Sequence, residues 1–109
     1  MKYRLRYMED VMTDREHIKA YLSQFYPGTL KKFFILLKKK TIRLKTFPYS
    51  CPEYEDVSDY RKLVVGDYLV FYIVNEDLKT VDIHRILHGS RDIRQHLNWF
   101  NKIWNGTSV

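Results

Sequence analysis

The chain has 109 residues, of which 45% are hydrophobic and 16% aromatic. That length fits one domain over residues 1–109, and that much apolar material excludes an intrinsically disordered chain. Nineteen Lys and Arg against 13 Asp and Glu give a net charge of +6. A basic surface favours a polyanionic partner, which is nucleic acid, an anionic membrane or an acidic protein segment.

The cysteine content and the N-terminus bear on the compartment. Cys51 is the single cysteine, so an intrachain disulfide is excluded, as suits a reducing cytoplasm. Residues 1–7 contain no long apolar run, which excludes a signal peptide and a membrane span there. We therefore expect a cytoplasmic protein with no membrane partner.

Residues 2–8 alternate between apolar and basic side chains. Tyr3, Leu5 and Tyr7 share one side, and basic residues occupy the other. A period of two predicts a strand with one buried face.

Two helices are expected next. Thr13 followed by Glu16 fits a capping box, which places the start of the first helix there. Pro27-Gly28 interrupts it, and Thr29 can cap a second helix that ends at Phe47-Pro48. So short a break predicts an antiparallel helix hairpin over residues 13–46. The apolar positions of the two helices are Ile18, Tyr21, Leu22, Phe25, Leu30, Phe33, Phe34, Leu37 and Leu44.

Three strands follow an acidic loop over residues 48–59. They are expected at Tyr60–Val65, Tyr68–Val74 and Thr80–His88, joined by turns at Gly66-Asp67 and at residues 75–77. Strands joined by tight turns are antiparallel, so they form a meander. Apolar residues at helical spacing over 91–104 predict a C-terminal helix. The order predicts an α+β domain with the helix hairpin on one face of the sheet.

Two segments carry a resemblance to a known family. Residues 60–72, YRKLVVGDYLVFY, are similar to the central hairpin of the RelE/ParE superfamily, the toxins of type II toxin–antitoxin systems. Residues 81–92, VDIHRILHGSRD, are similar to its last strand and the turn after it. The resemblance implies the same fold: an N-terminal strand, a helix hairpin, a three-stranded antiparallel meander that joins one sheet, and a C-terminal helix.

The resemblance implies a toxin with one of two targets. RelE-like members cut messenger RNA in the ribosomal A site, whereas ParE-like members poison DNA gyrase and are not known for nuclease chemistry. A cognate antitoxin that wraps around the toxin blocks both. Our first interpretation is ribosome-dependent mRNA cleavage by a metal-independent endoribonuclease without a cofactor. The alternatives are a gyrase inhibitor that acts by binding, and a degenerate member that binds only its antitoxin.

RNA cleavage through the 2′-hydroxyl needs a base, cations on the phosphate and an acid for the leaving oxygen. Arg61 and Arg91 fall at basic positions of the family and could clamp a phosphate, although salt bridges to the acidic loop would also explain them. His88 could transfer a proton, or could cap the turn at Gly89. If the protein is such a nuclease, replacing either arginine by alanine should restore growth and leave thermal stability nearly unchanged, because both arginines are expected to be exposed and an exposed arginine contributes little to folding.

Further basic residues are candidates for RNA binding. They are Lys62, His84, Arg85, Lys38 and Lys39, the last two on the lysine-rich face of the second helix, which could equally be a solvated surface. Strand alternation predicts that His84 and His88 share one face with Asp82. No third ligand group accompanies them in the sequence, so we expect no metal.

Two positions depart from the family pattern. Leu69 stands where the family usually has Arg after the Tyr of its second hairpin strand, and Leu63 stands at a second basic position. Alternation puts Leu69 on the face of Phe71, which makes that face more apolar than a RelE-like active site requires. These residues favour the gyrase or the non-catalytic alternative.

Overall fold

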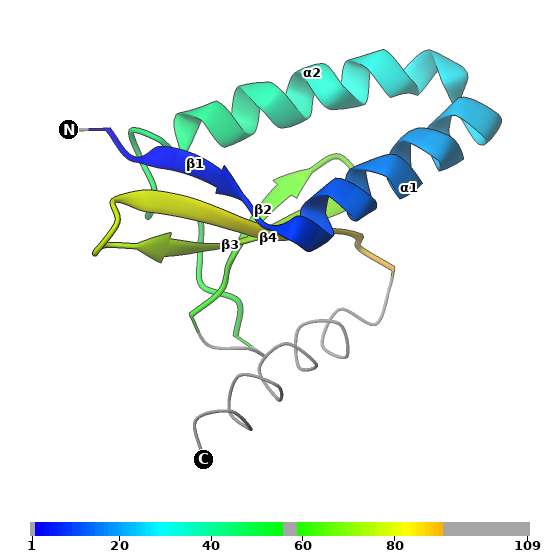
Figure 1. Ribbon diagram of the computed structural model, residues 1–109. Helices are drawn as coiled ribbons and strands as arrows, with labels where there is room; N and C mark the ends of the chain where they lie inside the picture. The colour runs from blue at the N-terminus through cyan, green and yellow to red at the C-terminus, as the bar shows by residue number, and fades with distance from the viewer. Residues whose placement is uncertain (1, 56–58, 91–109) are drawn as a thin grey trace.

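The computed structural model describes residues 2–55 and 59–90, which form two helices and a four-stranded sheet (Figure 1). The elements in chain order are β1 (Arg4–Tyr7), α1 (Glu9–Phe25), α2 (Pro27–Arg43), β2 (Arg61–Val65), β3 (Tyr68–Asn75) and β4 (Thr80–His88). The predicted α+β class and helix hairpin are confirmed. The expected helix over residues 91–104 lies outside the described residues.

The strands are ordered β1-β4-β3-β2. β2 pairs antiparallel with β3, and β3 with β4, so the predicted meander is confirmed. β1 pairs parallel with β4, with Arg4 opposite Thr80. A parallel pair needs a long connection, and here it includes the helix hairpin. At the β2–β3 turn Gly66 has φ +58, a left-handed conformation that costs glycine little.

Both helices begin earlier than the capping signals predicted. α1 begins at Glu9, so Thr13 lies inside the helix and is not its cap. The earlier start buries Val11 completely and places Glu9 in the first turn, where the helix dipole favours an acidic side chain. α2 begins at Pro27 instead of at Thr29, because proline is preorganised for the first helical position.

The helix hairpin covers one face of the sheet, as predicted. The core on this face contains residues of both helices and of all three meander strands, including Val11, Ile18, Leu22, Phe33, Leu37, Leu44, Val65, Val70, Tyr72, Val81, Ile83 and Ile86. Tyr21 and Phe25 were expected in it but are 46% and 57% exposed. In Figure 1 the end of the hairpin at which α1 and α2 meet projects beyond the sheet.

Candidate functional site

A β-bulge in β4 places His84 and His88 on opposite faces of the sheet. Phe71 pairs with Arg85, but Tyr72 pairs with Ile83, so β4 carries one extra residue between them. The ring of His84 lies 5.4 Å from that of Tyr60, on the face away from the helices. The ring of His88 lies 5.2 Å from that of Tyr68, which belongs to the helix-covered core. The expectation that the two histidines share a face is therefore wrong, because the extra residue inverts the alternation.

The face away from the helices carries an aromatic and basic group of residues. We call it the open-face cluster: Tyr54, Tyr60, Lys62, Phe71 and His84. The rings of Tyr54 and Phe71 are 5.1 Å apart, and the Lys62 ammonium lies 5.8 Å from the centre of the Tyr54 ring. Lys62 and His84 are thus placed on one face, as two of the predicted RNA contacts require.

Burial sets the protonation of this cluster. It raises the pKa of the Tyr60 hydroxyl to about 12, because the phenolate would lose its hydration. Burial also lowers the pKa of His84, and the nearby Asp82 carboxylate opposes that effect. His84 is consequently biased toward its neutral form, which can accept a proton.

Leu69 lies on the same face. It is half-buried against the second hydrophobic cluster, which contains Tyr60, Phe71 and Leu87. The alternation argument that placed Leu69 beside Phe71 is confirmed. This part of the face is apolar where a RelE-like toxin has an arginine.

Arg61 is held by the loop that precedes it. Its Nη1 donates a hydrogen bond of 2.7 Å to the carbonyl of Cys51, and its guanidinium carbon lies 4.9 Å from the centre of the Tyr49 ring. An ion pair of 3.7 Å with Glu53 adds to these contacts. The side chain is only 20% exposed. The expectation of an exposed Arg61 is wrong, and the alternative of a salt bridge to the acidic loop describes its position.

Arg85 joins the sheet to α1. It donates two hydrogen bonds of 2.8 Å, from Nε and Nη2, to the two carboxylate oxygens of Asp14. Asp14 also accepts the Ile86 N–H at 2.9 Å. Both carboxylate oxygens are therefore occupied, and Arg85 is fixed in an internal ion pair. Asp14 lies between Val11 and Ile18 on the buried side of α1. A carboxylate among the apolar residues of a helix face indicates a buried cationic partner, and this was the signal in the sequence for the ion pair with Arg85.

His88 caps the chain turn after β4. Its Nδ1 accepts a hydrogen bond of 3.1 Å from the Ser90 N–H and lies 2.7 Å from the Ser90 hydroxyl oxygen. Since Nδ1 accepts from the backbone, the neutral ring carries its proton on Nε2. The Gly89 N–H donates to the Asp67 carbonyl at 2.9 Å. His88 thus occupies the capping position that was its alternative interpretation.

The remaining predicted residues do not join this face. Lys38 and Lys39 are exposed on α2, on the other side of the sheet from Lys62 and His84. Arg91 lies outside the described residues. Within residues 2–55 and 59–90, no three potential ligand side chains group as a metal would require, and no helix is both long and apolar enough to cross a bilayer.

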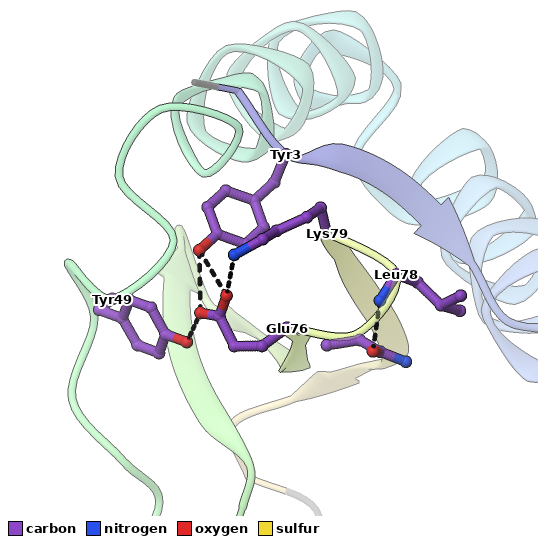
Figure 2. Close-up of polar contacts among 6 residues, drawn as sticks. Tyr3, Tyr49, Glu76, Leu78 and Lys79 are labelled. Carbon is purple, nitrogen blue, oxygen red and sulfur yellow. Dashed lines mark hydrogen bonds and ion pairs between the residues drawn. The ribbon is translucent and has the colours of Figure 1, made fainter.

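A carboxylate in the β3–β4 turn links segments that are distant in sequence. Glu76 accepts hydrogen bonds from the hydroxyls of Tyr3 and Tyr49 and from the Lys79 ammonium, with Tyr3 and Lys79 at 2.8 and 2.7 Å (Figure 2). These contacts lower the pKa of Glu76 to about 2, with the Lys79 contact first. They tie the N-terminus and the loop after α2 to the turn. The sequence pattern predicts only that this residue belongs to a turn.

The family described as the ParE toxin of the type II toxin–antitoxin system parDE matches residues 5–93, most of the chain. The chain belongs to the ParE toxin family. It is thus a type II toxin of the RelE/ParE superfamily, as the hairpin and last-strand sequences predicted. No curated protein sequence matches this ParE-family chain.

Solved structures share the fold of this ParE-family toxin. The chromosomal ParDE system of Pseudomonas aeruginosa contains a chain with a TM-score of 0.68 and 15% identity, over 80% of this chain and 96% of that one. The isolated RelE toxin of Escherichia coli has a TM-score of 0.58 and 15% identity, and the match covers 93% of this chain and 98% of that one. A chain in a RelBE toxin–antitoxin complex of Mycobacterium tuberculosis has a TM-score of 0.57 and 18% identity, and the match covers 81% of this chain and 99% of that one. At these identities the likeness concerns the fold alone.

Proposed function

We propose that this toxin arrests growth in the cytoplasm by binding DNA gyrase, and that a cognate antitoxin holds it inactive. The observation that carries the choice of target is the set of contacts made by Arg61, a candidate for clamping the phosphate, and by Arg85, a candidate for binding RNA. Arg85 donates its hydrogen bonds to Asp14. Arg61 donates one to the Cys51 carbonyl and lies over the Tyr49 ring. A preorganised transition-state clamp needs cations directed at the substrate, and these two are directed into the protein.

The chemistry of the open face supports the same proposal. On this face Leu69 and Ile73 of β3 are half-buried apolar residues, whereas Phe71 between them is fully buried and forms the base of the apolar cluster. A face of this kind suits contact with a protein better than contact with a phosphate, because aromatic and aliphatic groups dominate protein interfaces. The resemblance to ParE-like members adds gyrase as the protein concerned.

The test of the proposal uses two purified targets. Gyrase acting on relaxed plasmid DNA should lose supercoiling activity and accumulate cleaved DNA when the toxin is added. Translating ribosomes with a defined mRNA, given the same toxin concentrations, should yield intact message. Cleaved message together with unaffected gyrase would overturn the proposal.

Ribosome-dependent mRNA cleavage remains the second candidate, because Lys62, which lies against Tyr54, and His84, which lies against Tyr60, are on the same face of the sheet. A neutral His84 could take the 2′-hydroxyl proton, and Lys62 could stabilise the phosphate. If this candidate holds, Lys62→Ala and His84→Gln should each slow cleavage about a hundredfold. Lys39→Ala, which changes a lysine on the other side of the sheet, is the matched control.

A further inference from the structure

The charged residues of α2 all have one sign. Its 17 residues contain no Asp or Glu and six basic residues, which are Lys31, Lys32, Lys38, Lys39, Lys40 and Arg43. The chain has 19 Lys and Arg against 13 Asp and Glu. Nineteen less the six of α2 leaves 13, so the two signs balance in the rest of the chain. The whole net charge of +6 is therefore the charge of this one helix.

Most of these cations are exposed and unpaired. Lys40 is partly buried and donates a hydrogen bond of 2.8 Å to the Val64 carbonyl. Within residues 2–55 and 59–90, the side chains of the other five form no ion pair and no hydrogen bond. We call these five exposed residues the α2 basic face: Lys31, Lys32, Lys38, Lys39 and Arg43. They are free to contact an anionic partner.

The α2 basic face is long and straight. Lys39 follows Lys32 by two helical turns, and Arg43 follows Lys39 by one, so the three side chains lie in a row on one side of the helix. The row spans about 17 Å at a rise of roughly 1.5 Å per residue. In Figure 1 the sheet lies on one side of α2, and no described element covers its other side.

The chemistry of this face favours nucleic acid among the polyanions. An amphipathic helix binds a membrane by inserting its apolar face, but Phe33 and Leu37 on that face of α2 are buried in the core. Protein interfaces are depleted in lysine, the residue that dominates here. Phosphate groups, in contrast, are bound by lysine and arginine side chains without further requirements.

The same face favours a duplex over a single strand. Proteins bind single strands by stacking the bases on exposed aromatic rings. The α2 basic face has no aromatic member, since Phe33 is buried and Phe34 is half-buried with the Arg15 guanidinium 5.5 Å from the centre of its ring. A rigid row of cations suits the regular backbone of a duplex, which carries one negative charge for about every 1.7 Å of its axis.

We propose that the α2 basic face binds the phosphate backbone of duplex DNA, so that the toxin contacts gyrase and its DNA at the same time. The inference rests on the proposed gyrase target and adds DNA as a second ligand. The open face of the sheet and α2 are on opposite sides of the sheet, so the two contacts do not compete. Phosphate contacts carry no sequence information, so the binding is independent of DNA sequence.

Binding of the purified toxin to a short duplex DNA of mixed sequence tests the site without gyrase. Fluorescence anisotropy over a range of salt concentrations gives the slope of the logarithm of the binding constant against the logarithm of the salt concentration. Arg43→Gln and Lys32→Gln, at the two ends of the row, should each reduce the steepness of this slope by about 1, because each loses one phosphate contact.

An arginine on the other side of the sheet provides the matched control. Arg4 is exposed, and it points away from the helices because its neighbour Leu5 packs against the helix-covered core. Arg4→Gln makes the same change of net charge and should leave the slope as in the wild type. Equal slopes for Arg43→Gln and Arg4→Gln would overturn the proposal, because the affinity would then follow net charge and not the α2 basic face.

Competition identifies the class of ligand. An unlabelled duplex of a different sequence should displace the labelled DNA. Single-stranded RNA of the same length should do so only at higher concentration, since a single strand releases fewer counterions for each phosphate contact. Displacement by the RNA at equal or lower concentration, or by vesicles of anionic phospholipid at equal phosphate concentration, would overturn the assignment to duplex DNA.

A gyrase assay separates this inference from the proposed function. Inhibition of supercoiling by the wild type, with a several-fold higher concentration needed for Arg43→Gln, would support both. If the wild type leaves gyrase unaffected while Arg43→Gln alters the salt slope, gyrase is removed as the target and the DNA site stands. If the wild type and Arg43→Gln inhibit gyrase equally and bind DNA with equal slopes, the DNA site is removed and gyrase stands.

Discussion

Arg85 and Asp14 form a two-pronged ion pair between β4 and α1, with both nitrogen–oxygen distances at 2.8 Å. The side chains are 20% and 6% exposed, so the pair is largely removed from water. Removing one partner of such a pair leaves the other charge desolvated and unpaired.

The first prediction is that Asp14→Ala lowers the free energy of unfolding by about 3 kcal/mol. The substitution also leaves the Ile86 N–H without its acceptor. Urea denaturation of the purified variant measures the change. Glu16→Ala, at an exposed position of the same helix, should change the free energy by no more than about 0.5 kcal/mol. Similar losses for both variants would show that the ion pair contributes nothing specific.

The strands of this toxin could be predicted because local patterns determine them. β4 occupies Thr80–His88, as alternation and its flanking turns indicated, and Gly66-Asp67 makes the turn before β3. The helix starts were misplaced because Thr13 and Thr29 are good caps in isolation. Burial of Val11 and the preference of Pro27 for the first turn outweighed them.

The site depends on contacts that no local pattern encodes. The bulge adds one residue to β4, so the core-facing positions change from Val81 and Ile83 to Ile86, and strict alternation wrongly predicts a shared face for His84 and His88. Arg85 and Asp14 are 71 residues apart in the sequence, and Tyr3 and Glu76 are 73 residues apart. Only the arrangement of the sheet brings such residues together.

The second prediction concerns Arg61. Arg61→Ala should lower the free energy of unfolding by about 1–2 kcal/mol, because it removes a charged hydrogen bond to the Cys51 carbonyl and the stacking on Tyr49. Thermal melting beside a growth assay measures it. Lys39→Ala, at an exposed lysine, should melt close to the wild-type temperature. If Arg61→Ala loses toxicity but melts at the wild-type temperature, Arg61 acts in target recognition or cleavage and not in folding.

The third prediction concerns acid stability. The pKa of Glu76 is lowered from 4.5 to about 2, so folding favours the carboxylate. Its contribution to stability is present above pH 4.5 and is lost as the pH falls toward 2. Glu76→Gln cannot titrate, so the melting temperature of the variant should decline less over this range than that of the wild type. Solvent screening keeps the amplitude small because Glu76 is exposed.

A neighbouring residue provides the control for this measurement. Asp77→Asn changes an exposed carboxylate in the same turn and should leave the wild-type decline in place. Parallel curves for wild type and Glu76→Gln would contradict the role given to Glu76.

The last prediction concerns His84. Burial lowers the pKa of its imidazole below the ordinary value of 6.5, although Asp82 opposes the shift. Below pH 6.5 the unfolded chain therefore takes up a proton that the folded protein resists, and stability falls as the pH drops through the folded pKa. His84→Gln removes this titration, so the variant should lose less stability than the wild type between pH 6.5 and the folded pKa. Titration of the imidazole signals by NMR gives the folded value directly. A midpoint for His84 at or above 6.5 would show that Asp82 prevails over burial, and would remove the bias toward the neutral form that supports the second functional candidate.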